Sequence, residues 1–149
     1  MSGYPPLFFA SDHGGYILKE SLIEHYSNTL PSQVIHNLGT YTNDSVDYIA
    51  YADKVCLAVG KGDGLGILLC GTGIGMSIRA NRFLGIRAAL VVSEEMARLA
   101  KEHNNANILC LGGRTTSFLD AIYYIDQWLM ATFQGGRHQR RVELLDKRV

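Results

Sequence analysis

The sequence predicts an α/β fold in which a five-stranded parallel sheet lies between two layers of helices. Short apolar segments alternate five times with longer segments whose apolar residues recur at helical spacing. This alternation is typical of the strand–helix units that build a parallel sheet. The apolar segments are continuous rather than alternating in polarity, as expected of strands that helices cover on both faces.

The expected elements follow one another without interruption. The strands are expected at residues 7–10, 34–35, 65–70, 87–92 and 107–111. The helices are expected at residues 16–27, 47–59, 76–83, 94–103 and 116–133. The polar, basic tail is expected to form a further helix from about residue 138. No linker, low-complexity tract or internal repeat is present, so we expect residues 1–149 to form a single domain.

The composition narrows the classes of function. Lysine plus arginine and aspartate plus glutamate both number 14, and a net charge of zero argues against a general nucleic-acid binder. Residues 1–6 lack a basic signal segment, and no apolar run approaches the roughly 18 residues of a membrane span, so a cytoplasmic location is expected. Three cysteines fit free thiols better than a disulfide framework. No cysteine or histidine pair has the spacing of a zinc site, so no metal is expected.

Three of the expected strands are followed by segments that carry reactive groups. Ser-Asp-His-Gly-Gly (11–15) follows the first, Cys-Gly-Thr-Gly-Ile-Gly (70–75) ends the third, and Gly-Gly-Arg (112–114) closes the fifth. Ligands of open α/β sheets bind beyond the carboxyl ends of the strands. An acid, an imidazole, a thiol, a hydroxyl and a guanidinium would therefore meet at one edge, which predicts a functional site there.

The glycine-rich segment Gly71–Gly75 predicts an anion-binding loop. It lies between a strand and a helix, where free amides and the helix N-terminus point toward one place. A tight turn is the alternative, although one glycine usually suffices for a turn. The pattern is G-x-G-x-G rather than the dinucleotide pattern G-x-G-x-x-G, but Glu94 follows at about the distance of the acid in that pattern. A nucleotide-binding module therefore stays an alternative.

The cysteines and the tail each have a structural and a functional interpretation. Cys56 and Cys110 lie inside apolar segments and are expected in the core. Cys70 also fits the core, but its place at a strand end beside a helix N-terminus favours the thiolate and hence a function. Arg137 and Arg141 are four residues apart, so they share one side of a helix and form either a solvated charged face or a clamp for phosphate.

The ordered set of motifs resembles the type B ribose-5-phosphate isomerases, a family that also includes galactose-6-phosphate and allose-6-phosphate isomerases. The likeness spans nearly the whole chain. The segments that carry it are 11–15, Asp47-Tyr48, 70–75, Ala80-Asn81, Gly-Ile-Arg-Ala (85–88), His-Asn-Asn-Ala-Asn (103–107), 112–114 and Gly-Gly-Arg-His-Gln-Arg-Arg-Val (135–142).

The resemblance implies a three-layer Rossmann-like fold with strand order 2-1-3-5-4 and a C-terminal helical tail. It implies interconversion of ribose 5-phosphate and ribulose 5-phosphate, a step of the pentose phosphate pathway, through an ene-diolate and without a cofactor. It also implies a homodimer, or a tetramer built from it, with sites at the subunit interface. An isomerase of a six-carbon sugar phosphate such as allose 6-phosphate, a nucleotide-binding module and a non-catalytic interaction domain stay alternatives.

The resemblance further implies a role for each site residue. One branch of the family uses a cysteine as the base, and the other has glycine there and a glutamate at the position that Met76 occupies here, so this chain resembles the cysteine branch. The implied catalytic residues are Cys70 as the base, His103 for ring opening, and Thr72 and Asp12 for hydroxyl protons. The implied sugar-binding residues are Asp12, His13, Tyr48, Gly71, Thr72, Gly73, Ile74, Gly75 and Asn104. The implied phosphate ligands are His13, Arg114, Arg137 and Arg141.

Overall fold

The computed structural model describes residues 3–149. Its strands are β1 (Leu7–Ser11), β2 (Ile35–Asn37), β3 (Leu65–Cys70), β4 (Ala88–Leu90) and β5 (Ile108–Gly112). Its helices are α1 (Tyr16–Thr29), α2 (Tyr48–Gly60), α3 (Ile74–Ala80), α4 (Glu94–Asn104), α5 (Phe118–Met130) and α6 (Arg137–Leu145). The strands form one parallel sheet in the order β2-β1-β3-β5-β4, so the predicted fold and strand order are confirmed.

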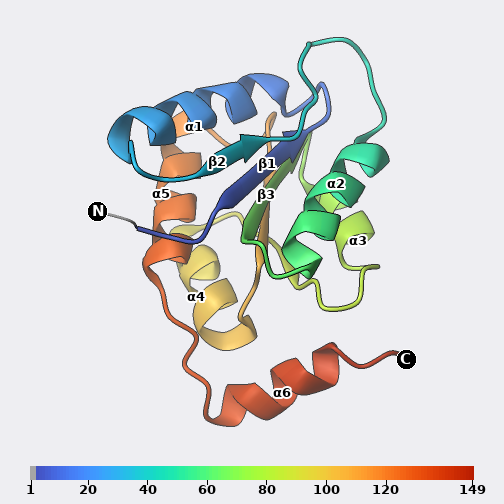
Figure 1. The fold of residues 1–149 in the computed structure, drawn as a ribbon, viewed down its shortest axis with the longest axis vertical. Helices are drawn as coiled ribbons and strands as arrows, with labels where there is room; N and C mark the ends of the chain where they lie inside the picture. Colours follow the sequence, from blue (N-terminus) through green and yellow to red (C-terminus); the bar gives the residue numbers. More distant parts are fainter. Residues whose placement is uncertain (1–2) are drawn as a thin grey trace.

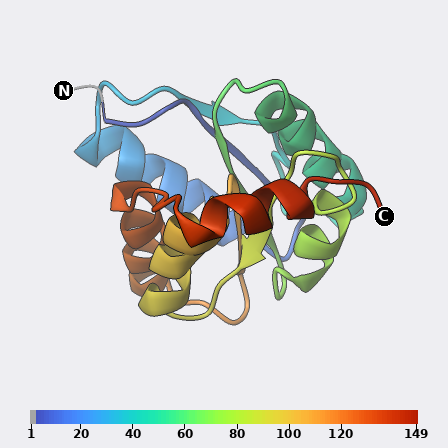
Figure 2. The same ribbon diagram turned by 90° about the horizontal axis from the view of Figure 1, so that it is seen from below.

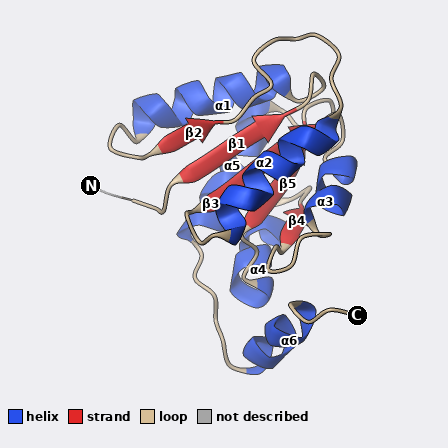
Figure 3. Cartoon of the chain, turned by 45° about the vertical axis from the view of Figure 1, so that its right-hand side comes forward, coloured by secondary structure: helices blue, strands red, loops and turns tan. Residues whose placement is uncertain are grey.

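The sheet separates two apolar cores. Helices α1, α4 and α5 cover one face, and α2 and α3 cover the other (Figures 1 and 3). Successive side chains of a strand point to opposite faces. In β3, Ile67 and Leu69 join the first core, whereas Leu68 and Cys70 join the second. The Cys70 side chain therefore lies on the face that α2 and α3 cover.

Helix α6 lies outside both layers. It runs beneath α4 at the lower end of the molecule, far from the arrowheads of the strands in Figure 1, and crosses the front of Figure 2. Its buried residues are His138 and Val142. An ion pair links the C-terminal end of α6 to the residue before β4: Arg87 Nη1 donates to both carboxylate oxygens of Asp146 at 3.0 Å.

Most elements differ from their predicted bounds by one to three residues, and three of these differences have a physical reason in the structure. The strand expected at 87–92 is only Ala88–Leu90, because β4 is an edge strand that pairs with β5 alone. The helix expected at 116–133 begins at Phe118, because Ser117 caps it by accepting a hydrogen bond from the Asp120 amide on its Oγ at 3.1 Å. The helix expected from Met76 begins at Ile74, directly after the left-handed Gly73. None of the helices within residues 3–149 is long and apolar enough to cross a membrane.

Candidate active site

Three loops meet at the carboxyl ends of β1, β3 and β5. The Gly113 amide donates to the Cys70 carbonyl at 2.7 Å, and the Arg114 amide donates to the Gly71 carbonyl at 2.9 Å. A Cβ atom placed on Gly14 would lie 2.9 Å from the Gly71 nitrogen, so the first loop also packs directly on the second. The motifs that follow the first, third and fifth strands therefore form one surface, as the sequence predicts.

Cys70 is the last residue of β3 and lies against the glycine loop. Its side chain is buried, and Sγ accepts a hydrogen bond from the Gly73 amide at 3.1 Å. This amide points at the sulfur because Gly73 has a left-handed backbone with φ of 80°. A Cβ atom on Gly73 would lie 2.9 Å from the Leu111 backbone, so the loop accommodates only glycine there.

The other two cysteines occupy a different environment. Burial raises the pKa of the Cys56 thiol to about 12, and burial raises the pKa of the Cys110 thiol well above its usual value. Both thiols stay protonated near neutral pH and belong to the core between the sheet, α2 and α3. The prediction that Cys56 and Cys110 are core residues is confirmed.

The first loop fixes an acid and an imidazole next to the glycine loop. Asp12 is buried, and its Oδ1 accepts hydrogen bonds from the Gly14 amide at 2.8 Å and the Gly15 amide at 3.2 Å. The Nδ1 atom of His13 accepts a hydrogen bond from the Val46 amide at 3.2 Å. A neutral imidazole that accepts on Nδ1 carries its proton on Nε2, so His13 keeps a donor for a ligand.

Further polar groups surround the glycine loop. The guanidinium of Arg114 lies over Gly71, because a Cβ atom on Gly71 would be 2.9 Å from Arg114 Nη1. The ring of Tyr48 lies at the other end of the loop, where a Cβ atom on Gly75 would be 3.0 Å from the phenolic oxygen. Thr72 is exposed, and its Oγ1 accepts a hydrogen bond from the Ile74 amide at 3.3 Å.

The remaining predicted residues lie at the opposite edge of the sheet. His103 and Asn104 end α4, and the exposed Arg137 and Arg141 lie on α6. This end of α4 adjoins the amino ends of the strands, where the Asn107 carbonyl accepts a hydrogen bond from the Gly66 amide at 2.9 Å. Strand β3 alone spans about 20 Å at roughly 3.3 Å per residue. One chain therefore carries two separate groups of site residues, which we call the thiol group (Asp12, His13, Tyr48, Cys70–Gly75 and Arg114) and the tail group (His103, Asn104, Arg137 and Arg141).

Beside the tail group lies His138, a buried residue of α6 to which the sequence assigned no role. The imidazoles of His103 and His138 are stacked, with ring centroids 4.2 Å apart and ring planes inclined by 14°. Burial lowers the pKa of His138, and the neighbouring His103, Arg137 and Arg141 lower it further. The spacing of His138 and Val142 on one side of the tail helix was a usable signal that His138 faces inward.

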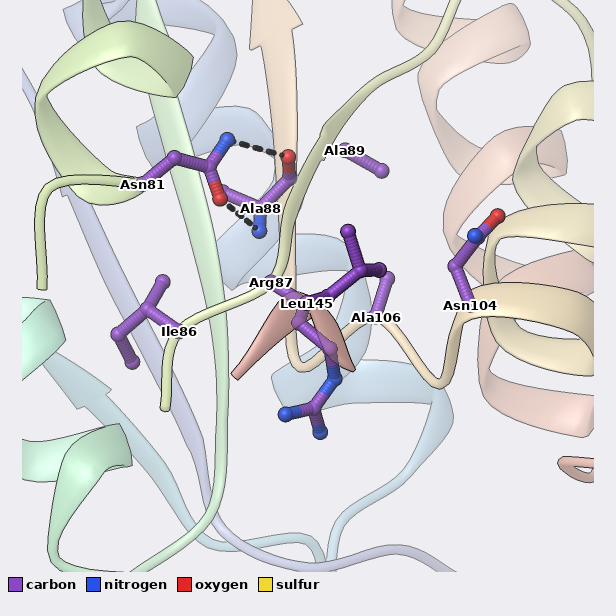
Figure 4. A pocket seen from close by; sticks show the side chains of 8 residues that line it. All are labelled: Asn81, Ile86, Arg87, Ala88, Ala89, Asn104, Ala106 and Leu145. Atoms are coloured by element: carbon purple, nitrogen blue, oxygen red, sulfur yellow. Dashed lines mark hydrogen bonds between the residues drawn. The ribbon is translucent and has the colours of Figure 1, made fainter. Parts of the chain in front are cut away.

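Each group has a hollow beside it. A cavity of 440 Å³ lies next to the tail group, with Asn104, Arg87 and Leu145 among its lining residues (Figure 4). On its wall, Asn81 holds the Ala88 backbone through two hydrogen bonds of 2.9 and 2.8 Å. A second cavity of 390 Å³ lies next to the thiol group, with His13, Arg114 and Phe118 among its lining residues.

Metal-binding side chains are not gathered at either place. Residues 3–149 contain no group of three or more histidine, cysteine, aspartate or glutamate residues that could hold a metal ion. Independence from metals stays a prediction.

The fold and the thiol group define an α/β protein with a glycine-rich loop around a thiol at the carboxyl edge of its sheet. Residues 7–145 match the model of the ribose/galactose isomerase family, and the chain belongs to this family. The family resemblance of the ordered motifs is thus confirmed.

Individual relatives cover nearly the whole chain. Ribose-5-phosphate isomerase B of Escherichia coli is 42% identical over 139 residues, which are 92% of this chain and 91% of the relative. A ribose 5-phosphate isomerase structure from Thermotoga maritima has a TM-score of 0.92 and 45% identity, and covers 95% of this chain and 97% of that one. Ribose-5-phosphate isomerase B from Mycoplasma genitalium, solved with bound ribulose-5-phosphate, has a TM-score of 0.88 and 42% identity, and covers 95% of this chain and 93% of that one.

Proposed function

We propose that the protein interconverts ribose 5-phosphate and ribulose 5-phosphate by proton transfer through an ene-diolate. The observation that carries this proposal is the Cys70 sulfur, which accepts a hydrogen bond from the Gly73 amide of the glycine-rich loop. The named relatives support the same substrates, since one of them was solved with ribulose-5-phosphate bound.

In the proposed reaction, Cys70 is the base. Its thiolate removes the proton from C2 of the open-chain aldose, and the electron pair of that C–H bond forms the C1–C2 double bond of the ene-diolate. The amides of Gly71–Gly75 stabilise the developing negative charge on the oxygens. The proton then returns from the thiol to C1, which gives the ketose. Asp12 and the exposed Thr72 hydroxyl transfer the proton between the two hydroxyl oxygens, while Tyr48 lines the pocket.

The phosphate is proposed to bind at the cavity beside the thiol group. His13 and Arg114 line this cavity from two different loops. His13 donates from Nε2, because the Val46 amide occupies its Nδ1, and Arg114 supplies a planar charged donor. These two groups come from the same chain as Cys70.

The tail group is proposed to complete the site of a second copy in a homodimer. His103, Asn104, Arg137 and Arg141 lie at the sheet edge away from their own Cys70, so they cannot act on the substrate that this thiol holds. A two-fold dimer would place the tail group of each chain against the thiol group of its partner. His103 would then open the furanose ring, Asn104 would bind a sugar oxygen, and the two arginines would complete the phosphate site.

The exposed apolar residues around the glycine loop support this dimer. Ile74 and Ile78 of α3 follow the glycine loop directly and are each more than half exposed, so a partner surface could cover them. The cavity beside the tail group has an apolar residue of α6, Leu145, in its lining. Burial of one surface in the other would remove both from water. A cytoplasmic location fits the three free cysteines.

The experiment that tests the proposal is incubation with ribose 5-phosphate in deuterated water, followed by NMR. An ene-diolate mechanism with exchange at the thiol predicts ribulose 5-phosphate that carries deuterium at C1. Allose 6-phosphate in a parallel sample measures the preference for five or six carbons. Absence of ketose with both substrates would contradict an isomerase and favour a nucleotide-binding or interaction module.

A further inference from the structure

We propose that His138 is a positioning residue, which holds the imidazole of His103 in the orientation that ring opening requires. This inference rests on the proposed function, in which His103 opens the furanose of ribose 5-phosphate. It assigns to the tail helix a second task besides the presentation of arginines.

His103 needs such support because little else restrains its ring. The residue lies on the last turn of α4 and is partly exposed. Among residues 3–149, its side chain takes part in no hydrogen bond that would orient it, whereas Asp12 and His13 are both held by backbone amides. Its ring stacks in parallel on His138, at 4.2 Å between ring centroids. A flat neighbour limits the rotation of the His103 ring about its side-chain bonds.

The placement of His138 suits this task better than a role in binding. His138 is 6% exposed and faces α4, whereas Arg137 and Arg141 are exposed on the same helix. Its Nε2 atom is buried without a hydrogen-bond partner. A buried polar atom without a partner destabilises the fold, and an apolar ring of the same shape would avoid that cost. The contact that the structure gives this ring is its face on His103, so stacking is the role that the geometry supports for His138.

The charge of the pair fits the same task. Burial and the neighbouring Arg137 and Arg141 lower the pKa of His138, which keeps this ring neutral near pH 7. A neutral stacking partner adds no positive charge of its own beside a His103 ring that takes up a proton. From α4, Lys101 and Glu102 are the charged residues that precede His103 in the same turn.

Three variants separate positioning from mere docking of the helix. His138→Phe keeps a flat ring, and His138→Leu keeps apolar volume without one; both remove the unpaired nitrogen. Val142→Ala is the matched control, because Val142 is buried on the same helix one turn further on. Initial rates are measured with ribose 5-phosphate, which must open its ring, and with ribulose 5-phosphate, whose phosphate blocks closure through O5. The inhibition constant of inorganic phosphate shows whether Arg137 and Arg141 still bind phosphate in each variant.

We expect His138→Leu to lower kcat for ribose 5-phosphate roughly ten- to hundred-fold more than for ribulose 5-phosphate. His138→Phe should restore most of this loss, and Val142→Ala should leave the ratio of the two rates as in the wild type. The inhibition constant of phosphate should change little in all three. Equal rate ratios in the leucine and phenylalanine variants, or a shift of the same size in Val142→Ala, would overturn the inference. Inactivity of the wild-type protein with both sugars would instead overturn the proposed function itself.

Discussion

Shared sites between two chains can be tested by mixing two inactive variants. One variant is Cys70→Ala, which lacks the proposed base, and the other is the double variant Arg137→Ala, Arg141→Ala, which lacks the proposed phosphate clamp of the tail. Each variant is expected to be nearly inactive alone at low substrate. Charge-assisted hydrogen bonds contribute about 1.5–3 kcal/mol each, so loss of a single arginine should raise KM about ten- to hundred-fold.

The expected recovery follows from the geometry of the chain. Strand β3 separates the thiol group from the tail group by about 20 Å, so each proposed site takes its cysteine from one chain and its arginines from the other. In a mixed two-fold dimer, one site then carries both defects and the other carries none. Random exchange of equal amounts gives about half mixed dimers, and hence about a quarter of all sites intact.

The assay is the initial rate of ketose formation before and after subunit exchange, at a ribose 5-phosphate concentration below the KM of the double variant. We expect about a quarter of the wild-type rate after exchange and almost none before it. As a control, a sample that contains Cys70→Ala alone should stay inactive after the same exchange procedure. No recovery, with exchange shown independently by mass spectrometry, would refute the assignment of the arginines to the partner's site.

Four further predictions use the same assay or thermal unfolding. Cys70→Ala should fold normally and lose about 10²–10⁴-fold in kcat. Cys110→Ala should keep its kcat, because burial raises the pKa of the Cys110 thiol well above its usual value. Similar rates for the two variants would refute the assignment of Cys70 as the base. His103→Ala should lose more activity with ribose 5-phosphate than with ribulose 5-phosphate, and equal losses in initial rate would remove it from ring opening. Turnover should be unchanged after treatment with a chelator, and restoration of a lost activity by a divalent ion would contradict this. Burial lowers the pKa of His138 in the folded chain, so as the pH falls through about 6.5 the unfolded chain takes up a proton before the folded chain does. The wild type should therefore lose stability relative to His138→Phe as the pH falls from about 8 to about 5. A difference in Tm between the two proteins that stays constant with pH would contradict this sign.

The sequence determined the parts of this protein that depend on local pattern. The alternation of apolar and amphipathic segments predicted the five strands, because a strand covered on both faces must be apolar throughout. The segments 11–15, 70–75 and 112–114 were predicted to meet, because the carboxyl ends of parallel strands share one edge of a sheet. The contacts of Gly14 and of the Gly113 and Arg114 amides with residues 70–71 agree with that expectation.

Only the tertiary structure decided which groups hold these residues in place. The Val46 amide, which fixes the proton of His13 on Nε2, lies 33 residues away in a segment without a motif. The stack of His103 on His138 depends on how the tail helix docks on α4. Periodicity shows that His138 and Val142 share a helix face, but it does not show which element that face meets.

The division of the site residues into two groups was likewise a matter of tertiary structure. In the sequence, His103 and Arg137 read as parts of the same set of motifs as Cys70. Their separation within one chain follows from the direction of α4, which returns from the carboxyl edge to the amino edge of the sheet, where the tail helix packs beneath it. A motif states which side chains are present, whereas the path of the backbone through a packed core determines which of them one chain can bring to a single substrate.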